Sequence, residues 1–214
     1  MNVVITHFPE VLSGLWTTLQ LAVLSFVGAL VIGTIVAIMR ISPVAPLRAA
    51  GLVYVEFFRN IPLLSLLFLV VFGLPDLNVT FSLFISVVVG MSFFSGAFVC
   101  ESVRTGINTV PIGQAEAARA IGLTFTQSLR RVILPQAFRS MIQPLVNVWI
   151  GTLIGTSLAA AVGVYELTAE GQFLQLTYAG GLPVFASIAL LYIAMALLSG
   201  GAGAWLERKA AIAR

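Results

Sequence analysis

Long apolar stretches, each bounded by charged or turn-forming residues, constrain the fold of this chain more than any other feature. The first runs from about residue 15 to residue 39, and an α-helix needs about 20 such residues to cross a bilayer. The 214 residues are 59% hydrophobic and only 9% charged, which is too little charge to cover the surface of a water-soluble domain. The sequence therefore predicts an all-α integral membrane protein.

Five transmembrane helices are expected in a single domain, residues 1–214. The second must begin near residue 49, because the apolar run 61–74 alone is too short to cross a bilayer. The segment before the first span has no Lys or Arg, so a cleavable signal, which needs a basic start, is not expected. Polar residues return after about residue 163 and predict a short surface helix before the last span. The expected spans are approximately residues 15–39, 49–73, 81–103, 139–162 and 183–206.

Two pairs of opposite charges lie three residues apart, on one face of a helix. Glu101 and Arg104, at the end of the third span, are interpreted as an interfacial ion pair. Glu56 and Arg59 lie in the second span just before Pro62, which is expected to kink the helix. Charges at membrane depth face protein or water. Glu56 and Arg59 are therefore interpreted in one of two ways: as another interfacial ion pair, or as a contact with the hydrophilic loop described next or with the mouth of a transport pathway.

A hydrophilic stretch, residues 105–135, separates the third and fourth spans. Its pattern predicts two short helices joined by a turn. The Ala-rich run after Pro111 favours a helix that starts with this proline in its first turn. Gly122 suits the turn, because glycine adopts left-handed conformations at little cost. The second helix can be capped by Thr124 or Thr126.

Small and polar residues repeat along one face of the fourth span. They recur every four residues, at Gln143, Asn147, Gly151 and Gly155, with Thr152 and Thr156 beside them. Amide groups against hydrocarbon are costly unless they are paired, so this stripe is expected to face another helix or a wet path. Small residues in the third span serve either packing or the same path. The candidates for the translocation path are Ser92, Ser95, Gln143, Asn147, Thr152 and Thr156.

The distribution of positive charge predicts the orientation of the chain. With the amino terminus outside, all eleven Lys and Arg residues fall in cytoplasmic segments or at cytoplasmic helix ends, as the positive-inside rule requires. The hydrophilic stretch is then cytoplasmic. Because these cations are dispersed among membrane segments, the net charge of +3 does not indicate nucleic-acid binding. The cations are Arg40, Arg48, Arg59, Arg104, Arg119, Arg130, Arg131, Arg139, Arg208, Lys209 and Arg214.

The chain carries no pattern of catalytic residues. It has no glycine-rich phosphate loop followed by Lys and Ser or Thr. Its single histidine, His7, excludes a multi-histidine metal site, and its single cysteine, Cys100, lies in an apolar run and is interpreted as a small buried residue. We therefore expect no enzymatic activity and no cofactor on this chain. Energy for uphill transport must come from another protein.

A longer pattern runs through the hydrophilic stretch. Glu116-Ala117-Ala118 is followed by three residues, Gly122, nine residues and then Val132-Ile133-Leu134-Pro135. It resembles the EAA loop of permease subunits of bacterial ATP-binding cassette (ABC) importers, whose pattern ends in Ile, any residue, Leu-Pro. Only that Ile is changed here, to Val132. The length of the pattern separates it from an ordinary connecting loop.

The resemblance extends over nearly the whole chain, to the polar amino acid subfamily of these permeases. It implies a type I ABC importer permease in a bacterial cytoplasmic (inner) membrane, with the carboxyl terminus in the cytoplasm. The residues that carry it, besides the loop, are 14–40, 58–64, 100–104, 134–139 and 147–158.

The resemblance also implies partners. These are a second permease copy or a homologous permease, two cytoplasmic ATP-binding subunits that hold ATP and Mg, an extracytoplasmic amino acid-binding protein, and membrane lipid. The helix around Glu116 would dock into a groove on the ATPase, and closure of the ATPase pair would move the transmembrane helices. The contact residues that the resemblance implies are Glu116, Ala117, Ala118, Arg119, Gly122 and Leu123.

The substrate is less constrained. Residues 58–64 look most like permeases for glutamate and aspartate. Many members carry Lys-Asp before the Thr-Ser-Leu segment that starts at Thr156, whereas this chain has Ile154-Gly155, which leaves a substrate site built on that charged pair in question.

Two other classes of protein stay open from the sequence. An ion-coupled secondary transporter would also be apolar and could use Glu56 or Glu101 for ions, but such folds commonly contain internal repeats, and this sequence shows none. A non-transporting intramembrane scaffold would need neither a polar stripe nor a helical loop. Only the importer permease should co-purify with an ATPase subunit.

Overall fold

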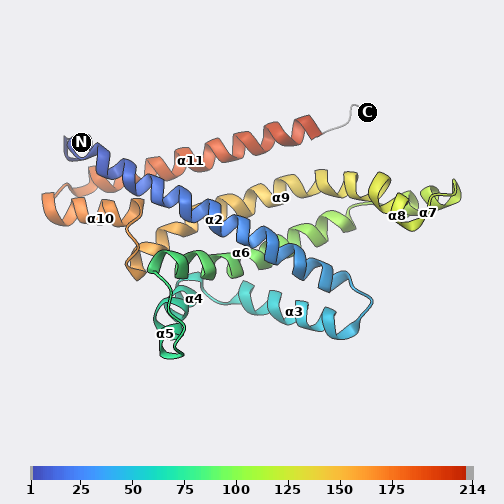
Figure 1. Ribbon diagram of the computed structural model, residues 1–214. Helices are drawn as coiled ribbons and strands as arrows, with labels where there is room; N and C mark the ends of the chain where they lie inside the picture. Colours follow the sequence, from blue (N-terminus) through green and yellow to red (C-terminus); the bar gives the residue numbers. More distant parts are fainter. Residues whose placement is uncertain (1, 211–214) are drawn as a thin grey trace.

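The computed structural model describes residues 2–210, and these residues form helices joined by short turns (Figure 1). Four helical segments are long and apolar enough to cross a membrane, and a fifth is present if one bent pair counts as a span. The expected all-α membrane fold is confirmed. In chain order the segments are α1 (Asn2–Thr6), α2 (Phe8–Ile41), α3 (Ala45–Asn60), α4 (Leu63–Phe68), the π-helix η1 (Leu69–Gly73), α5 (Leu74–Asp76), α6 (Leu83–Asn108), α7 (Ile112–Ala120), α8 (Phe125–Ser128), the π-helix η2 (Leu129–Ile133), α9 (Leu134–Gly155), the 3₁₀-helix η3 (Thr156–Val162), α10 (Leu167–Tyr178) and α11 (Gly181–Ala210).

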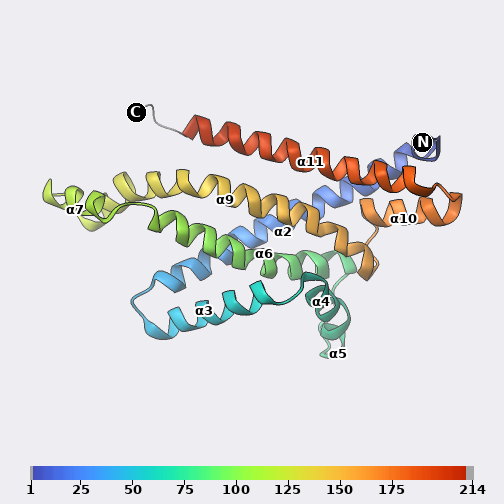
Figure 2. The ribbon, with the colours of Figure 1, turned by 180° about the vertical axis from the view of Figure 1, so that it is seen from behind.

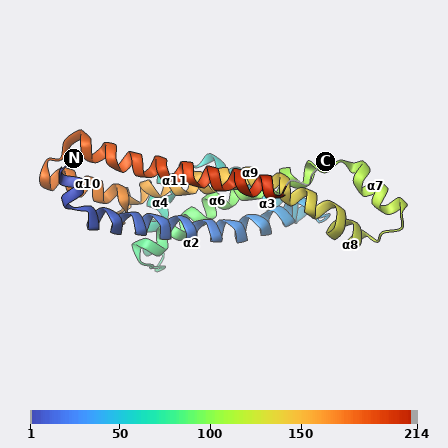
Figure 3. The ribbon, with the colours of Figure 1, turned by 90° about the horizontal axis from the view of Figure 1, so that it is seen from above.

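The long helices α2, α6, α9 and α11 lie side by side and form the bundle (Figures 1 and 2). α7 and α8 project from one end of this bundle, whereas α10 and the start of α2 lie at the opposite end (Figure 3). We call these the α7 end and the α10 end. The two ends are therefore built from different parts of the chain, and each carries its own polar features.

The second apolar segment is broken rather than straight. α3 and the segment from α4 to α5 meet at an angle of 105°, so that α4 and α5 project sideways from the bundle (Figure 1). Pro62 takes the N-cap position of α4. Proline has no N–H to donate and disfavours helical conformation in the residue before it, here Ile61. The kink expected at Pro62 is confirmed, although its size depends on packing of α4 against α6 and η3.

The helices α2 and α6 approach each other closely through small residues. A Cβ added to Gly28 would lie 2.3 Å from Ser92 Oγ, and one added to Gly33 would lie 2.5 Å from the carbonyl oxygen of Gly96. Ser92 Oγ donates to the carbonyl of Val88 in its own helix at 2.7 Å and lies 3.3 Å from the carbonyl oxygen of Ser25 on α2. Small residues allow such close contact between membrane helices. Ser92 therefore packs against α2.

An ion-pair cluster joins α2 to α6 near the α7 end. Arg104 Nη2 donates to Glu101 Oε2 at 2.7 Å, so the expected pair is confirmed. Arg40 of α2 donates to the other carboxylate oxygen, Oε1. Its side chain also passes α3, where a Cβ added to Gly51 would lie 2.8 Å from Arg40 Cγ. The carboxylate of Glu101 thus joins α2 to α6, and the Arg40 side chain that it binds also packs against α3.

Glu56 and Arg59 do not form the interfacial ion pair that the sequence offered as one interpretation, and neither has an ionic partner within residues 2–210. Arg59 instead lies over the ring of Phe98, with 5.9 Å between the guanidinium carbon and the ring centre. α3 runs from the α7 end toward the middle of the bundle (Figure 1). Phe98 lies about one turn farther into the bundle than Glu101. The Arg59 cation is therefore inside the length of the bundle.

A buried carboxylate joins three helices at the α10 end. Glu166 is 0% exposed. Its Oε1 caps α10 by accepting from the backbone nitrogens of Thr168 and Ala169 at 2.8 and 3.0 Å. Its Oε2 accepts from Thr18 Oγ1 at 3.2 Å and from Tyr192 Oη at 2.5 Å. The expectation of a short surface helix here is confirmed: α10 packs one face against α2 and α11 and exposes the other, which includes Gln172 and Leu176.

The hydrophilic stretch continues without a break into the fourth span. Residues Phe125–Val162 form one helical segment of 38 residues, which contains the expected span and extends it toward the amino terminus. The π-helical turn η2 lies directly before Pro135. Bonding from residue i to residue i+5 in that turn accommodates a proline, which has no N–H to donate, without ending the helix. The stretch is therefore joined to α9 by continuous helix.

Candidate functional site

The segment from α7 to η2, residues 112–133, forms a helical hook at one end of the bundle (Figure 3). We call it the α7 hook. Pro111 takes the N-cap position of α7, one residue earlier than expected. Gly122 has a φ of +85°, in the left-handed region, which confirms its expected role in the turn. Thr124 caps α8, because its Oγ1 accepts from the nitrogen of Gln127 at 3.3 Å while Gln127 Oε1 accepts from the nitrogen of Thr124 at 2.9 Å.

The outer surface of the α7 hook combines charged, small and large apolar side chains. Glu116, Ala117, Arg119 and Gly122 are exposed. Large apolar side chains outside a membrane are typical of a surface that contacts another protein. Sequence reasoning missed three of them, each 78% exposed, because apolar residues next to a helix end resemble core positions: Ile112, Ile121 and Phe125.

Two of the expected contact residues lie on the inner side of the hook. Ala118 is 4% exposed, and its carbonyl accepts a hydrogen bond from the nitrogen of Leu123 at 3.1 Å. Leu123 is half-buried. α7 also packs against η2. These two residues therefore stiffen the turn around Gly122 and leave the outer surface to their neighbours.

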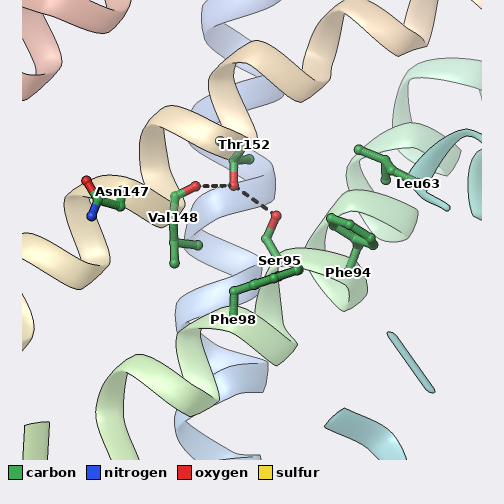
Figure 4. Close-up of a pocket in the computed structure, with 8 residues that line it drawn as sticks. Leu63, Phe94, Ser95, Phe98, Asn147, Val148 and Thr152 are labelled. Atoms are coloured by element: carbon green, nitrogen blue, oxygen red, sulfur yellow. Dashed lines mark hydrogen bonds between the residues drawn. The ribbon is translucent and has the colours of Figure 1, made fainter. Parts of the chain in front are cut away.

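A cavity of about 320 Å³ opens between α4, α6 and α9 (Figure 4). Ser95 Oγ and Thr152 Oγ1 lie 2.8 Å apart in its wall. Thr152 Oγ1 also donates to the carbonyl of Val148 at 2.8 Å, so Ser95 is the donor in the bond between the two hydroxyls. The residues that line the cavity are Leu63, Phe94, Ser95, Phe98, Asn147, Val148, Gly151 and Thr152.

The structure brings together only some of the path candidates. Ser95, Asn147 and Thr152 line the cavity, and Gln143 is exposed one turn before Asn147 on α9. Ser92 packs against α2 and does not reach the cavity. Thr156 is 0% exposed and donates to the carbonyl of Leu153 at 2.7 Å, so it lies in the core.

The glycines of the α9 stripe divide between packing and open space. A Cβ added to Gly155 would lie 3.2 Å from Leu63 Cδ2, whereas one added to Gly151 would have no atom within 4 Å. Neither Gln143 nor Asn147 has a hydrogen bond to a partner in the described part of the chain, and both are exposed. Unpaired amides are costly against hydrocarbon, so this face requires water or another protein.

Sequence reasoning missed the aromatic wall of the cavity and the position of Arg59. Phe94 and Phe98 look like ordinary lipid-facing or core residues of an apolar helix. They become part of a cavity wall because α4 folds back at Pro62 and brings Leu63 to their side. Only the kink itself was visible in the sequence.

The ionisable groups at the α10 end pack against one another. Among residues 2–210 no group of three or more His, Cys, Asp or Glu side chains is placed to hold a metal ion. His7 Nδ1 lies 3.3 Å from Glu10 Oε1, and its ring stacks on Tyr178 with centres 4.3 Å apart. Glu170 is 6% exposed. Burial raises the pKa of its carboxyl and the negative charge of Glu10 raises it further, while His7 acts in the opposite direction.

Comparisons with known proteins agree with this architecture. Residues 29–212 match the family described as binding-protein-dependent transport system inner membrane component. The chain is similar to a probable glutamine ABC transporter permease protein, GlnM, of Bacillus subtilis (strain 168), with 33% identity over 210 residues that cover 98% of this chain and 97% of that protein. It is 41% identical over 170 residues to the glutamate transport system permease protein GluC of Corynebacterium efficiens, covering 74% of this chain and 75% of that protein.

Solved structures give the same picture. The chain matches the crystal structure of an amino acid ABC transporter with histidines at a TM-score of 0.90 and 30% identity, over 96% of each chain. An inward-facing structure of the MetNI methionine ABC transporter matches at a TM-score of 0.82 and 23% identity, over 97% of this chain and 99% of that one, and so shares the fold. The family match covers most of the chain, and the chain therefore belongs to the inner membrane components of binding-protein-dependent transport systems.

Proposed function

We propose that this chain is the permease subunit of an ABC importer that moves polar amino acids into the cytoplasm. The observation that carries the proposal is the α7 hook, a stiff helical projection with an exposed apolar surface in a chain whose relatives are named as glutamine and glutamate permeases. We include glutamate and aspartate among the proposed substrates.

The hook is built to transmit movement. The capping box of Thr124 and Gln127 fixes the start of α8, and continuous helix connects α8 through η2 to α9. A push on α7 therefore moves α9 as a rigid body, whereas a flexible loop would absorb it. We place the contact with the ATP-binding subunit on Glu116, Ala117 and Arg119 together with the exposed apolar residues of the hook.

The proposed assembly also contains a second permease and two ATP-binding subunits, each with its ATP and Mg. A binding protein delivers substrate at the α10 end. The exposed amides of Gln143 and Asn147 support a second permease or a water-filled path beside α9. This arrangement sets the amino terminus outside and the carboxyl terminus in the cytoplasm. The support for that orientation is the placement of Lys and Arg under the positive-inside rule. Arg59, which lies over Phe98 inside the length of the bundle, is the exception and does not contribute to this argument.

We place the translocation path along the cavity between α4, α6 and α9. Ser95, Asn147 and Thr152 supply hydroxyl and amide groups to its wall. Arg59 lies against Phe98, which lines the same cavity, and this cation has no ionic partner in the described chain. A charge inside the length of the bundle faces protein or water, and a cation at that place suits the side-chain carboxylate of glutamate or aspartate.

Uptake by the reconstituted complex tests the proposal. The permease, with its ATP-binding subunits and a binding protein, is placed in liposomes, and uptake of glutamate, aspartate, glutamine and cystine is measured with and without ATP. We expect ATP-dependent accumulation of at least one of them, and a larger loss for glutamate than for glutamine when Arg59→Gln is introduced. Accumulation driven by an ion gradient through this chain alone would contradict the proposal and favour a secondary transporter.

A further inference from the structure

A second groove, of about 450 Å³, runs between α2, α9 and α11 and shares no lining residue with the cavity beside α4. We call it the α11 groove. Phe26 and Trp149 meet edge to face in it, with ring centres 5.4 Å apart. Trp149 Nε1 donates to Ser199 Oγ at 2.9 Å, so the polar group of the indole is satisfied within the protein. The surface left open in the groove is apolar.

The register of the two antiparallel helices fixes what lies at the end of this groove. Trp149 contacts Ser199, and one turn nearer the α7 end a Cβ added to Gly203 would lie 2.6 Å from Val146. One further turn along, Ile142 and Leu206 both line the groove. The next step in the same register is Arg139 on α9 and Lys209 on α11.

These two cations have no carboxylate partner within residues 2–210. Like charges at the same level of two packed helices repel each other unless an anion lies between them. Lys209 lies over the ring of Trp205, 4.3 Å from its centre, and both are exposed. Trp beside Lys is typical of the level at which a transmembrane helix crosses the lipid headgroups. The helical register therefore puts Arg139 and Lys209 one turn beyond the end of the groove, at the level expected for the lipid headgroups.

We infer that the α11 groove is a binding site for an anionic phospholipid, with an acyl chain along the apolar groove and the phosphate between Arg139 and Lys209. The charge complementarity favours this occupant, because a protein surface would have to bring a carboxylate to the same level, whereas every anionic lipid carries its phosphate there. The lipid would fill the space between α9 and α11 that direct contact at Gly203 leaves open. Since α9 carries the α7 hook, the lipid would support the helix that the hook moves.

Lipid retention by the purified complex tests this site. The permease complex is extracted in mild detergent, exchanged with phosphatidylglycerol or with zwitterionic phosphatidylcholine, and examined by native mass spectrometry. We expect phosphatidylglycerol to be retained preferentially. The double variant R139Q/K209Q should retain about thirtyfold less of it, since each of the two cations near the headgroups contributes about 1 kcal/mol. The matched control is Arg208→Gln, which removes a neighbouring exposed cation that lies on another face of α11.

A second variant tests the apolar part of the site without touching the charges. Ala202 lines the groove and is exposed, so Ala202→Phe should fill the groove and lower phosphatidylglycerol retention, while Leu198→Phe, on an exposed position outside the groove, should not. Equal retention by wild type, R139Q/K209Q and Ala202→Phe would overturn the inference. In a cross-linking experiment, the inference expects Ala202→Cys to react with a photoreactive phosphatidylglycerol. A cross-link to a second permease or to an ATP-binding subunit instead would overturn the inference as well.

Discussion

The phenol of Tyr192 donates a hydrogen bond of 2.5 Å to the carboxylate of Glu166, and this bond attaches α11 to the first turn of α10. The carboxylate is fully buried and has no cationic partner among the described residues. Hydrogen bonds from Thr18 Oγ1, two backbone nitrogens and the phenol take the place of a counter-ion. A single acidic side chain therefore joins α2, α10 and α11 at the α10 end of the bundle.

Replacing Tyr192 by Phe should destabilise this end of the protein. A hydrogen bond to a charged group contributes about 1.5–3 kcal/mol, and the buried carboxylate would lose its shortest one. We expect the purified protein in detergent to melt several degrees lower. The control is Tyr178→Phe, because Tyr178 stacks on His7 but makes no hydrogen bond to a described residue. Equal melting of the two variants would show that the Glu166 network does not hold the α10 end.

Replacing Gly122 by Val should abolish ATP-coupled uptake while leaving insertion and melting temperature nearly unchanged. The Cβ would meet no atom within 4 Å, so the effect would come from the left-handed backbone, which a β-branched residue strongly disfavours. Gly122→Asn should keep most of the activity, because asparagine tolerates this conformation. Gly113→Ala, in the helical part of the hook where space is also open, is the matched control. Normal uptake by Gly122→Val would rule out a stiff hook.

Replacing Gly151 by Phe should block the proposed path. The side chain would enter the cavity without displacing any atom near its Cβ. We expect uptake to fall about tenfold or more, which corresponds to about 1.4 kcal/mol in the transport barrier, while the complex still assembles and hydrolyses ATP. Gly201→Phe on α11 is the control, since its Cβ also has open space but lies outside the cavity. If Gly151→Phe transports as well as the control, the path lies elsewhere.

Glu170 should make the stability of the α10 end depend on pH. Its pKa is raised by burial and by Glu10, so the folded protein binds a proton more tightly than the unfolded one. The penalty is absent below the ordinary glutamate pKa of about 4.3 and grows as the pH rises through the folded-state pKa. We expect Glu170→Gln to melt higher than wild type at pH 8, with a difference that shrinks toward pH 5. A difference that is constant with pH would contradict this assignment.

The sequence predicted the α7 hook in detail because its signals are local. The turn at Gly122 depends only on the backbone conformation of this residue, and the helix cap at Thr124 depends only on the residue three positions later. Pro62 likewise predicted a kink. These features depend on residues close together in the chain. In backbone structure the hook differs from the prediction in the exact start of α7 and in the continuous helix through Pro135. Which side chains lie on its outer surface was predicted less well, since Ala118 is buried and Ile112 is exposed.

The rest depends on contacts between residues far apart in the sequence. Arg40 meets Glu101 only because α2 and α6 pack through glycine and serine, and Glu166 meets Tyr192 only because α10 lies under α11. The periodic stripe on α9 correctly predicted that Asn147 and Thr152 lie near each other. Ser92 and Ser95, however, are one turn apart on α6 and face different helices. The helical period alone could not say which face of α6 meets α2.

The most direct test of the central claim is a cross-link between the α7 hook and the ATP-binding subunit. The only native cysteine is Cys100, which is buried, so a Cys100→Ser background allows a single new cysteine at the exposed Ala117. We predict that a short bifunctional reagent joins Ala117→Cys to the ATP-binding subunit in the intact complex, with a yield that changes when ATP is added. A cysteine at Ala117 that reacts with a membrane-impermeant reagent added outside intact cells, and gives no cross-link, would contradict the account.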